Sequence, residues 1–170
     1  MRYTSYRDTR DAVWRLLIDL GADELPIKIS AVCKALDIDV RTLEELAPIQ
    51  HQMNLRGRRV VDGVARYVGG RPLILYNTLA GRARIRFTIA HELGHLLLGH
   101  VDQAPAHTIV TPVLFRKSEA ELSPEEQAAN IFASRLLAPA CVLWGLGAQN
   151  AEQIAAVCDI SQEAASYRME

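Results

Sequence analysis

The chain reads Arg86-Phe87-Thr88-Ile89-Ala90-His91-Glu92-Leu93-Gly94-His95 across the stretch that decides its fold. His91, Glu92 and His95 form the pattern HExxH. Residues four apart lie on one face of a helix, so the imidazoles of His91 and His95 can hold one metal ion. Glu92 lies roughly 100° further round the helix. Its carboxylate is therefore placed to take a proton from water at the metal without binding the metal itself.

This motif lies within a long apolar segment. The spacing predicts a helix over about residues 82–98, ended by Gly99 in the position of a C-cap. Apolar neighbours would bury that helix, and burial of a His-Glu-His set is costly unless the polar groups are satisfied. A metal ion satisfies them. Zn²⁺ is the ion we expect, with another divalent metal such as Mn²⁺ as an alternative.

The site needs a third protein ligand. His100 is one residue short of the extended pattern HExxHxxGxxH and follows Gly99, so we interpret it as a helix-end histidine stabilised by the helix dipole. A later helix, beginning at Ser123-Pro124, offers Glu125 and Glu126. Glu126 shares a face with the apolar stripe of that helix, which favours it slightly and leaves Glu125 as the alternative.

The composition fits one globular chain outside the membrane. It has 170 residues, of which 49% are hydrophobic and 23% charged. We find no apolar run long enough to span a bilayer and no signal-peptide pattern at the N-terminus, so we expect a cytoplasmic protein. The cysteines, at positions 33, 141 and 158, form no CxxC pair, and we expect three small buried apolar side chains.

The remaining segments predict an α+β fold, with a small mixed or antiparallel sheet flanked by helices. Residues 60–68 and 73–76 predict a hairpin, and residues 102–112 a loop. Short helices over 151–157 and 161–168 form a C-terminal helical pair. We therefore expect a domain over residues 1–140 with an appendage over 141–170.

Charge is unevenly distributed. Residues 56–86 contain eight arginines and one acid, Asp62, for a net charge of +7, and the rest of the chain carries −8. Either the arginines pair with Glu119, Glu121 and other acids of the fold, or they attract an acidic peptide. Residues 141–170 carry −3, because Arg168 stands against four acids. That charge repels phosphate, so we expect no direct contact with nucleic acid.

Two separated motifs give a resemblance. The stretch 86–95, followed by Glu126-Gln127-Ala128-Ala129-Asn130-Ile131-Phe132-Ala133 and by Leu136-Leu137-Ala138-Pro139, resembles the ImmA/IrrE metallopeptidase family over about residues 60–139. The resemblance implies a zincin-like fold, with His91 and His95 as metal ligands and Glu92 as general base. It also implies that the third ligand is Glu126, four residues before Asn130. Many relatives carry a second glutamate two residues before that asparagine, where this chain has Ala128.

The resemblance further implies a zinc endopeptidase of narrow specificity that acts on a helix-turn-helix repressor in a phage, mobile-element or stress-response circuit. The alternative is a metal-stabilised interaction module that controls a repressor without proteolysis. His107, Tyr76 and Arg71 are candidates for stabilising an oxyanion. By analogy with zincins, we expect strand 73–76 to be the sheet edge that pairs with an extended peptide.

Overall fold

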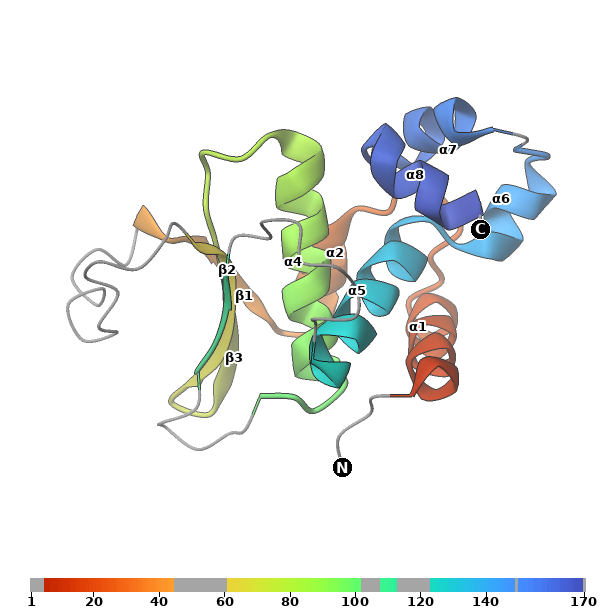
Figure 1. Cartoon of the computed structure of the whole chain (residues 1–170). Coiled ribbons are helices and arrows are strands. Elements are labelled where there is room, and N and C mark those ends of the chain that lie inside the picture. Colours follow the sequence, from red (N-terminus) through yellow and green to blue (C-terminus); the bar gives the residue numbers. More distant parts are fainter. Residues whose placement is uncertain (1–4, 45–60, 102–107, 113–122, 149, 170) are drawn as a thin grey trace.

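A small sheet is covered on one face by helices, in successive layers (Figure 1). The computed structural model describes residues 5–44, 61–101, 108–112, 123–148 and 150–169. Its elements are, in order, α1 (Tyr6–Asp19), α2 (Ile29–Ala35), β1 (Asp39–Thr42), β2 (Val61–Val68), β3 (Arg71–Tyr76), α4 (Arg82–Leu97), β4 (Thr108–Pro112), α5 (Pro124–Leu137), α6 (Ala140–Gly145), α7 (Ala151–Cys158) and α8 (Gln162–Met169). The predicted α+β class, with a mixed sheet flanked by helices, is confirmed.

The sheet has the strand order β1-β3-β2-β4, in which β1 runs parallel to β3 and the other two pairs are antiparallel. The predicted hairpin is β2-β3, and its turn residues Gly69 and Gly70 have φ values of 58° and 80°. Both values lie in the left-handed region that two-residue hairpin turns favour and that glycine adopts without strain.

Two expectations about the strands are wrong. Residues 108–112, expected as part of a loop, form β4 at the edge of the sheet. The run Thr108-Ile109-Val110-Thr111 is rich in β-branched residues, which suit a strand even where prolines interrupt the periodicity nearby. Strand 73–76 belongs to β3, which lies between β1 and β2 and is not an edge. The edge strands of the described sheet are β1 and β4.

Helix α4 lies between the sheet and α5, and α1 packs on the other side of α5 (Figure 1). Every residue of α4 from Thr88 to Leu96 is buried. Gly94 allows the close approach of α5, since a Cβ at this position would lie 3.1 Å from the Cβ of Phe132. The helix that carries the HExxH pattern is thus the central element of the fold.

The stretch Pro124–Gly145 is long and apolar enough to cross a membrane by length and composition alone, contrary to the expectation that no apolar run in this chain is. Half of an 18-residue apolar window within it is buried inside the fold, and the stretch comprises two helices, α5 and α6, separated at Pro139. Both features are typical of a core helix.

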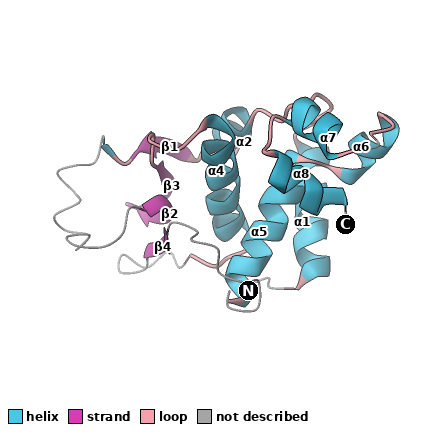
Figure 2. Ribbon diagram, turned by 45° about the horizontal axis from the view of Figure 1, so that its top comes forward, coloured by secondary structure: helices cyan, strands magenta, loops and turns pink. Residues whose placement is uncertain are grey.

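Helices α6, α7 and α8 gather at one end of the molecule (Figure 2). The predicted C-terminal pair is present as α7 and α8, and α6 precedes it. These helices share a small apolar cluster with the C-cap of α5, formed by Ala138, Leu143, Ile154, Cys158 and Ala165. The division of the chain at residue 140 stays a prediction.

Arginines join this end to the rest of the fold. The Arg86 guanidinium donates to the backbone carbonyls of Cys158 and Asp159, each at 3.1 Å, and lies 3.4 Å from the Asp159 carboxylate. Arg82 contacts the same carboxylate at 2.9 Å, and Arg84 pairs with Asp62 at 2.6 Å. Part of the positive segment is therefore neutralised within the fold. Glu119 and Glu121, the acids expected as partners, lie outside the described residues.

The three cysteines are free thiols. Cys33 and Cys158 are buried, as expected, and burial raises the pKa of the Cys33 thiol to about 12. Cys141 is exposed, which corrects the expectation for that residue, because it lies on the outer side of the short helix α6.

Candidate metal centre

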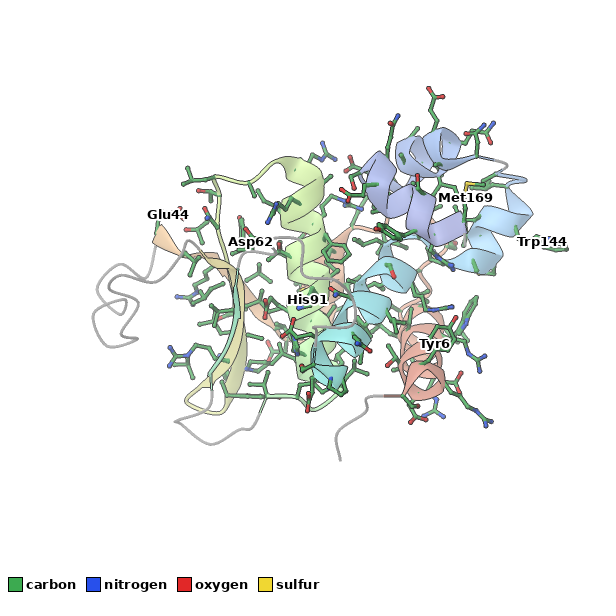
Figure 3. All side chains as sticks on the ribbon, viewed as in Figure 1. Tyr6, Glu44, Asp62, His91, Trp144 and Met169 are labelled. Carbon is green, nitrogen blue, oxygen red and sulfur yellow. The ribbon has the colours of Figure 1, made fainter. Side chains whose placement is uncertain are left out.

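The two histidines of the HExxH pattern lie one turn apart on α4 and are buried, with 1% and 0% of their surface exposed. The intervening Glu92 is also completely buried. Helix α4 ends as predicted, since Gly99 follows it with a φ of 73° and the His100 N–H donates to the carbonyl of His95. Figure 3 shows His91 at the side of α4 that faces α5.

Glu126 of α5 meets both histidines. Its Oε2 lies 3.3 Å from His91 Nε2 and its Oε1 lies 3.4 Å from His95 Nε2. The two Nε2 atoms are 3.0 Å apart, and one ligand atom from each of the three residues falls within 4.8 Å of the others. Of the two glutamates left open by the helical spacing, the structure brings Glu126 to the histidines, and the cluster found among the described residues does not include Glu125.

The start of α5 explains how Glu126 reaches this position. Ser123 is the N-cap and its hydroxyl accepts the N–H of Glu126 at 3.2 Å, while Pro124 occupies the first turn. A glutamate three residues after such a cap commonly bonds back to the cap amide. Here its two carboxylate oxygens instead face the histidines, and the side chain is 21% exposed.

Two side chains that were not expected to contact the metal ligands lie against the histidine rings. His91 Nδ1 lies 2.9 Å from Asn130 Oδ1, and an amide oxygen can only accept, so His91 donates from Nδ1 and keeps Nε2 for a metal. His95 Nδ1 lies 3.0 Å from His100 Nδ1, which is buried. His100 follows the end of α4, as expected, and its ring is in addition a partner of His95. Asn130 could have been found from its spacing, one turn after Glu126.

Burial and the contacts within the cluster shift the pKa values of His91, His95 and Glu126. Burial lowers the pKa of His91, but the contact with Glu126, the charge of Glu92 and the Asn130 contact outweigh it, so this pKa is raised. Burial dominates at His95 and lowers its pKa. Burial would raise the pKa of Glu126, yet the two histidines hold it well below its usual range. Glu126 is therefore an anion at neutral pH and His95 is neutral, the forms in which both bind metals.

This donor set fits a divalent metal. Two imidazole nitrogens and one carboxylate are the ligands that zinc takes in catalytic sites, where water or substrate completes the coordination. The two imidazoles are also buried and the carboxylate is mostly so, and a shared metal ion would offset the cost of removing these polar groups from water. The residues present therefore fit zinc, and they also fit Mn²⁺, which accepts carboxylate and imidazole ligands.

The three oxyanion candidates differ in position. Tyr76 ends β3 directly opposite Gly63 of β2, and the missing Cβ of Gly63 would meet Glu92. Arg71 is exposed at the opposite end of β3, beside the hairpin turn. His107 lies outside the described residues. Of the two described candidates, Tyr76 is the one that pairs with the strand residue lying against Glu92.

Replacing Asn130 or His100 with alanine should weaken zinc binding about 10–100-fold, the usual cost of losing an outer partner of a metal ligand. Asn130→Ala removes the acceptor of the His91 Nδ1–H, and His100→Ala removes the ring that contacts His95 Nδ1, while both changes leave the ligands in place. Competition with a chromophoric chelator measures the affinity. Ser134→Ala is the matched control on α5, because its hydroxyl donates only to the Ile131 carbonyl in the described structure. Equal affinities in Asn130→Ala and this control would contradict the assignment.

Comparison with known proteins agrees with this geometry. The model of a peptidase family, Peptidase_M78, described as the IrrE N-terminal-like domain, matches residues 33–170. No curated protein matches the chain. The match includes α4 with its HExxH pattern and the whole of α5. The chain therefore belongs to the IrrE N-terminal-like family of metal-dependent peptidases.

Proposed function

We propose that this protein is a zinc endopeptidase of narrow specificity whose substrate is a helix-turn-helix repressor. The observation that carries the proposal is the convergence of His91, His95 and Glu126 on one point, with Glu92 buried on the same helix. Membership of a metal-dependent peptidase family supports it. Repressor control and a cytoplasmic location are the proposals that the resemblance to ImmA/IrrE proteins adds.

The proposed mechanism assigns metal binding to three side chains and proton transfer to a fourth. His91, His95 and Glu126 would hold the ion, with Asn130 and His100 fixing the two rings. When bound, zinc supplies a Lewis acid that polarises a peptide carbonyl and lowers the pKa of water. The Glu92 carboxylate accepts a proton from the attacking water and returns it to the nitrogen of the leaving amine. Complete burial keeps the Glu92 carboxylate away from bulk water, as in active sites that exclude solvent.

Strand β4 is the edge that we assign to the substrate, in place of β3. It pairs with β2 on the side of the sheet away from β3, so its outer edge is not covered by another described strand. Gly63 of β2 pairs with Thr111 of β4. Gly63 is also the residue of the sheet that lies against Glu92, so Thr111 is the residue of β4 directly beside that position. An extended peptide added to this edge would be held by backbone hydrogen bonds.

The structure also favours a second candidate, a metal-stabilised interaction module that controls a repressor by contact. His91, Glu92 and His95 are almost completely buried, so access to the pair of histidines is narrow in this conformation. A module that binds without cleavage needs no more access than this. That the partner is an acidic peptide stays a prediction. The charge argument for it is weaker than the sequence suggested, because Arg82, Arg84 and Arg86 already pair with acids of the fold.

Co-expression with the helix-turn-helix repressor encoded beside the gene tests the proposal. Wild type should produce repressor fragments, and Glu92→Gln, which keeps the size and removes the proton acceptor, should reduce their rate of formation at least ~100-fold. Immunoblotting and mass spectrometry of the repressor give the readout. Glu152→Gln, an exposed change on α7, is the control that should cleave like wild type.

The two candidates predict different outcomes. A repressor that stays intact and is still inactivated by both wild type and Glu92→Gln would establish the interaction module and contradict the peptidase. A repressor that stays intact and active would exclude this repressor as partner. Fragments that appear equally with Glu92→Gln would contradict the role of Glu92.

A further inference from the structure

Gly63 of β2 lies against the face of α4 that carries Glu92. A Cβ at position 63 would stand 2.5 Å from Thr88 Cγ2 and 3.0 Å from both Cγ and Oε1 of Glu92. Real Cβ atoms essentially never show a contact of 2.5 Å, so one of these groups would have to move. Gly63 is buried and its φ is outside the left-handed region. Glycine is therefore required at this position for space and not for backbone conformation.

The strand next to Gly63 is irregular. The register between β2 and β4 shifts between Val61 and Gly63, which leaves Asp62 as the extra residue of a β-bulge. The Asp62 carboxylate accepts from Arg84 of α4 at 2.6 Å, and its backbone carbonyl accepts from the Asn77 N–H at 2.9 Å. The bulge is thus attached both to α4 and to the residue that follows β3.

These contacts follow one stripe of the helix. Arg84, Thr88 and Glu92 are spaced four residues apart and so lie along a single face of α4. The first is held by Asp62, and the other two lie against Gly63. Two consecutive residues of β2 therefore lie against the face of α4 that presents Glu92.

We propose that Gly63, within the bulge at Asp62, is a positioning residue that sets where the Glu92 carboxylate stands. The inference rests on the proposed function, because it names a residue that acts through the proposed general base. An alanine at 63 would push the Glu92 side chain by a few tenths of an ångström at its Cγ and its Oε1. Because a misplacement of about 1 Å can cost on the order of 100-fold in rate, we expect a shift of this size to cost about 10-fold.

A double-mutant cycle on thermal unfolding tests the contact without any substrate. Gly63→Ala should lower the melting temperature of the zinc-loaded protein by several degrees. The loss should be smaller when Glu92→Ala is also present, since that change removes both Glu92 atoms that the new Cβ meets. Gly145→Ala is the matched control, because a Cβ there meets nothing within 4 Å. It should not lower the melting temperature.

A second arm separates positioning from packing. Thr88→Ser removes the Cγ2 that the new Cβ would meet at 2.5 Å and leaves Glu92 unchanged. Adding Gly63→Ala to Thr88→Ser should therefore lower the melting temperature much less than Gly63→Ala lowers it in the wild type. Its kcat on the repressor of the co-expression experiment should stay about 10-fold below that of Thr88→Ser, with KM and zinc affinity changed less than twofold.

Each outcome decides. Equal losses of melting temperature from Gly63→Ala with and without Glu92 would overturn the inference, as would a return of kcat to the Thr88→Ser value once stability is regained. If the wild type cleaves nothing, the proposed peptidase fails. The coupling between positions 63 and 92 in the thermal cycle then still shows whether Gly63 sets the place of the Glu92 side chain.

Discussion

Replacing Glu126 with alanine should leave a folded protein that no longer holds zinc at concentrations that saturate the wild type. Glu126 supplies the only carboxylate in the three-residue cluster of the described structure, and each of its oxygens faces one histidine. Its removal leaves two imidazoles, one short of the three protein ligands of catalytic zinc sites. We expect a loss of affinity well beyond the ~100-fold limit for an outer partner. Metal content after gel filtration and a chelator-competition isotherm measure it.

Glu125→Ala is the matched control for this change. It alters the neighbouring residue in the same first turn of α5 and removes the same charge, yet Glu125 does not belong to the cluster. Zinc content should equal that of wild type, as it should in Glu152→Ala on α7. Retention of zinc in Glu126→Ala together with its loss in Glu125→Ala would move the third ligand to Glu125.

The parts of the site that could be predicted are those set by local helical periodicity. A spacing of four residues places His91 and His95 on one face of any helix. The apolar stripe of residues 129–137 only favours Glu126 over Glu125, and the choice between them comes from the resemblance to the ImmA/IrrE family. The capping signal Ser123-Pro124 fixes where that helix begins. The same local rules give the ends of α4 and the hairpin turn at Gly69.

The parts that could not be predicted depend on pairing between distant segments. The place of β3 inside the sheet depends on β1 pairing with it, across more than thirty residues of chain. The partnership of His100 with His95 depends on the turn at Gly99 folding back over α4, which the helix-dipole argument does not include. The need for glycine at 63 arises from the approach of β2 to α4, and a single sequence contains no sign of that approach.

Replacing Phe132 with alanine should cost the largest amount of stability of any single change considered in this protein. Phe132 is completely buried and stands where α5 crosses Gly94 of α4, with its ring within reach of the missing Cβ of that glycine. Truncation of a buried phenylalanine removes apolar contacts and leaves a cavity, at a cost of about 3–5 kcal/mol. A glycine on the facing helix has no side chain that can move to fill the space.

Denaturant unfolding in excess EDTA measures this loss without the contribution of a bound metal. Trp144→Ala is the control, because that larger aromatic side chain is 88% exposed on α6 and projects from the molecule (Figure 3), so its loss should stay within ~0.5 kcal/mol. Zinc affinity should fall in Phe132→Ala as well, since α5 also carries Glu126 and Asn130 to the histidines. If Phe132→Ala unfolded at the same denaturant concentration as Trp144→Ala, the contact of α4 with α5 would not be what holds the three metal ligands together.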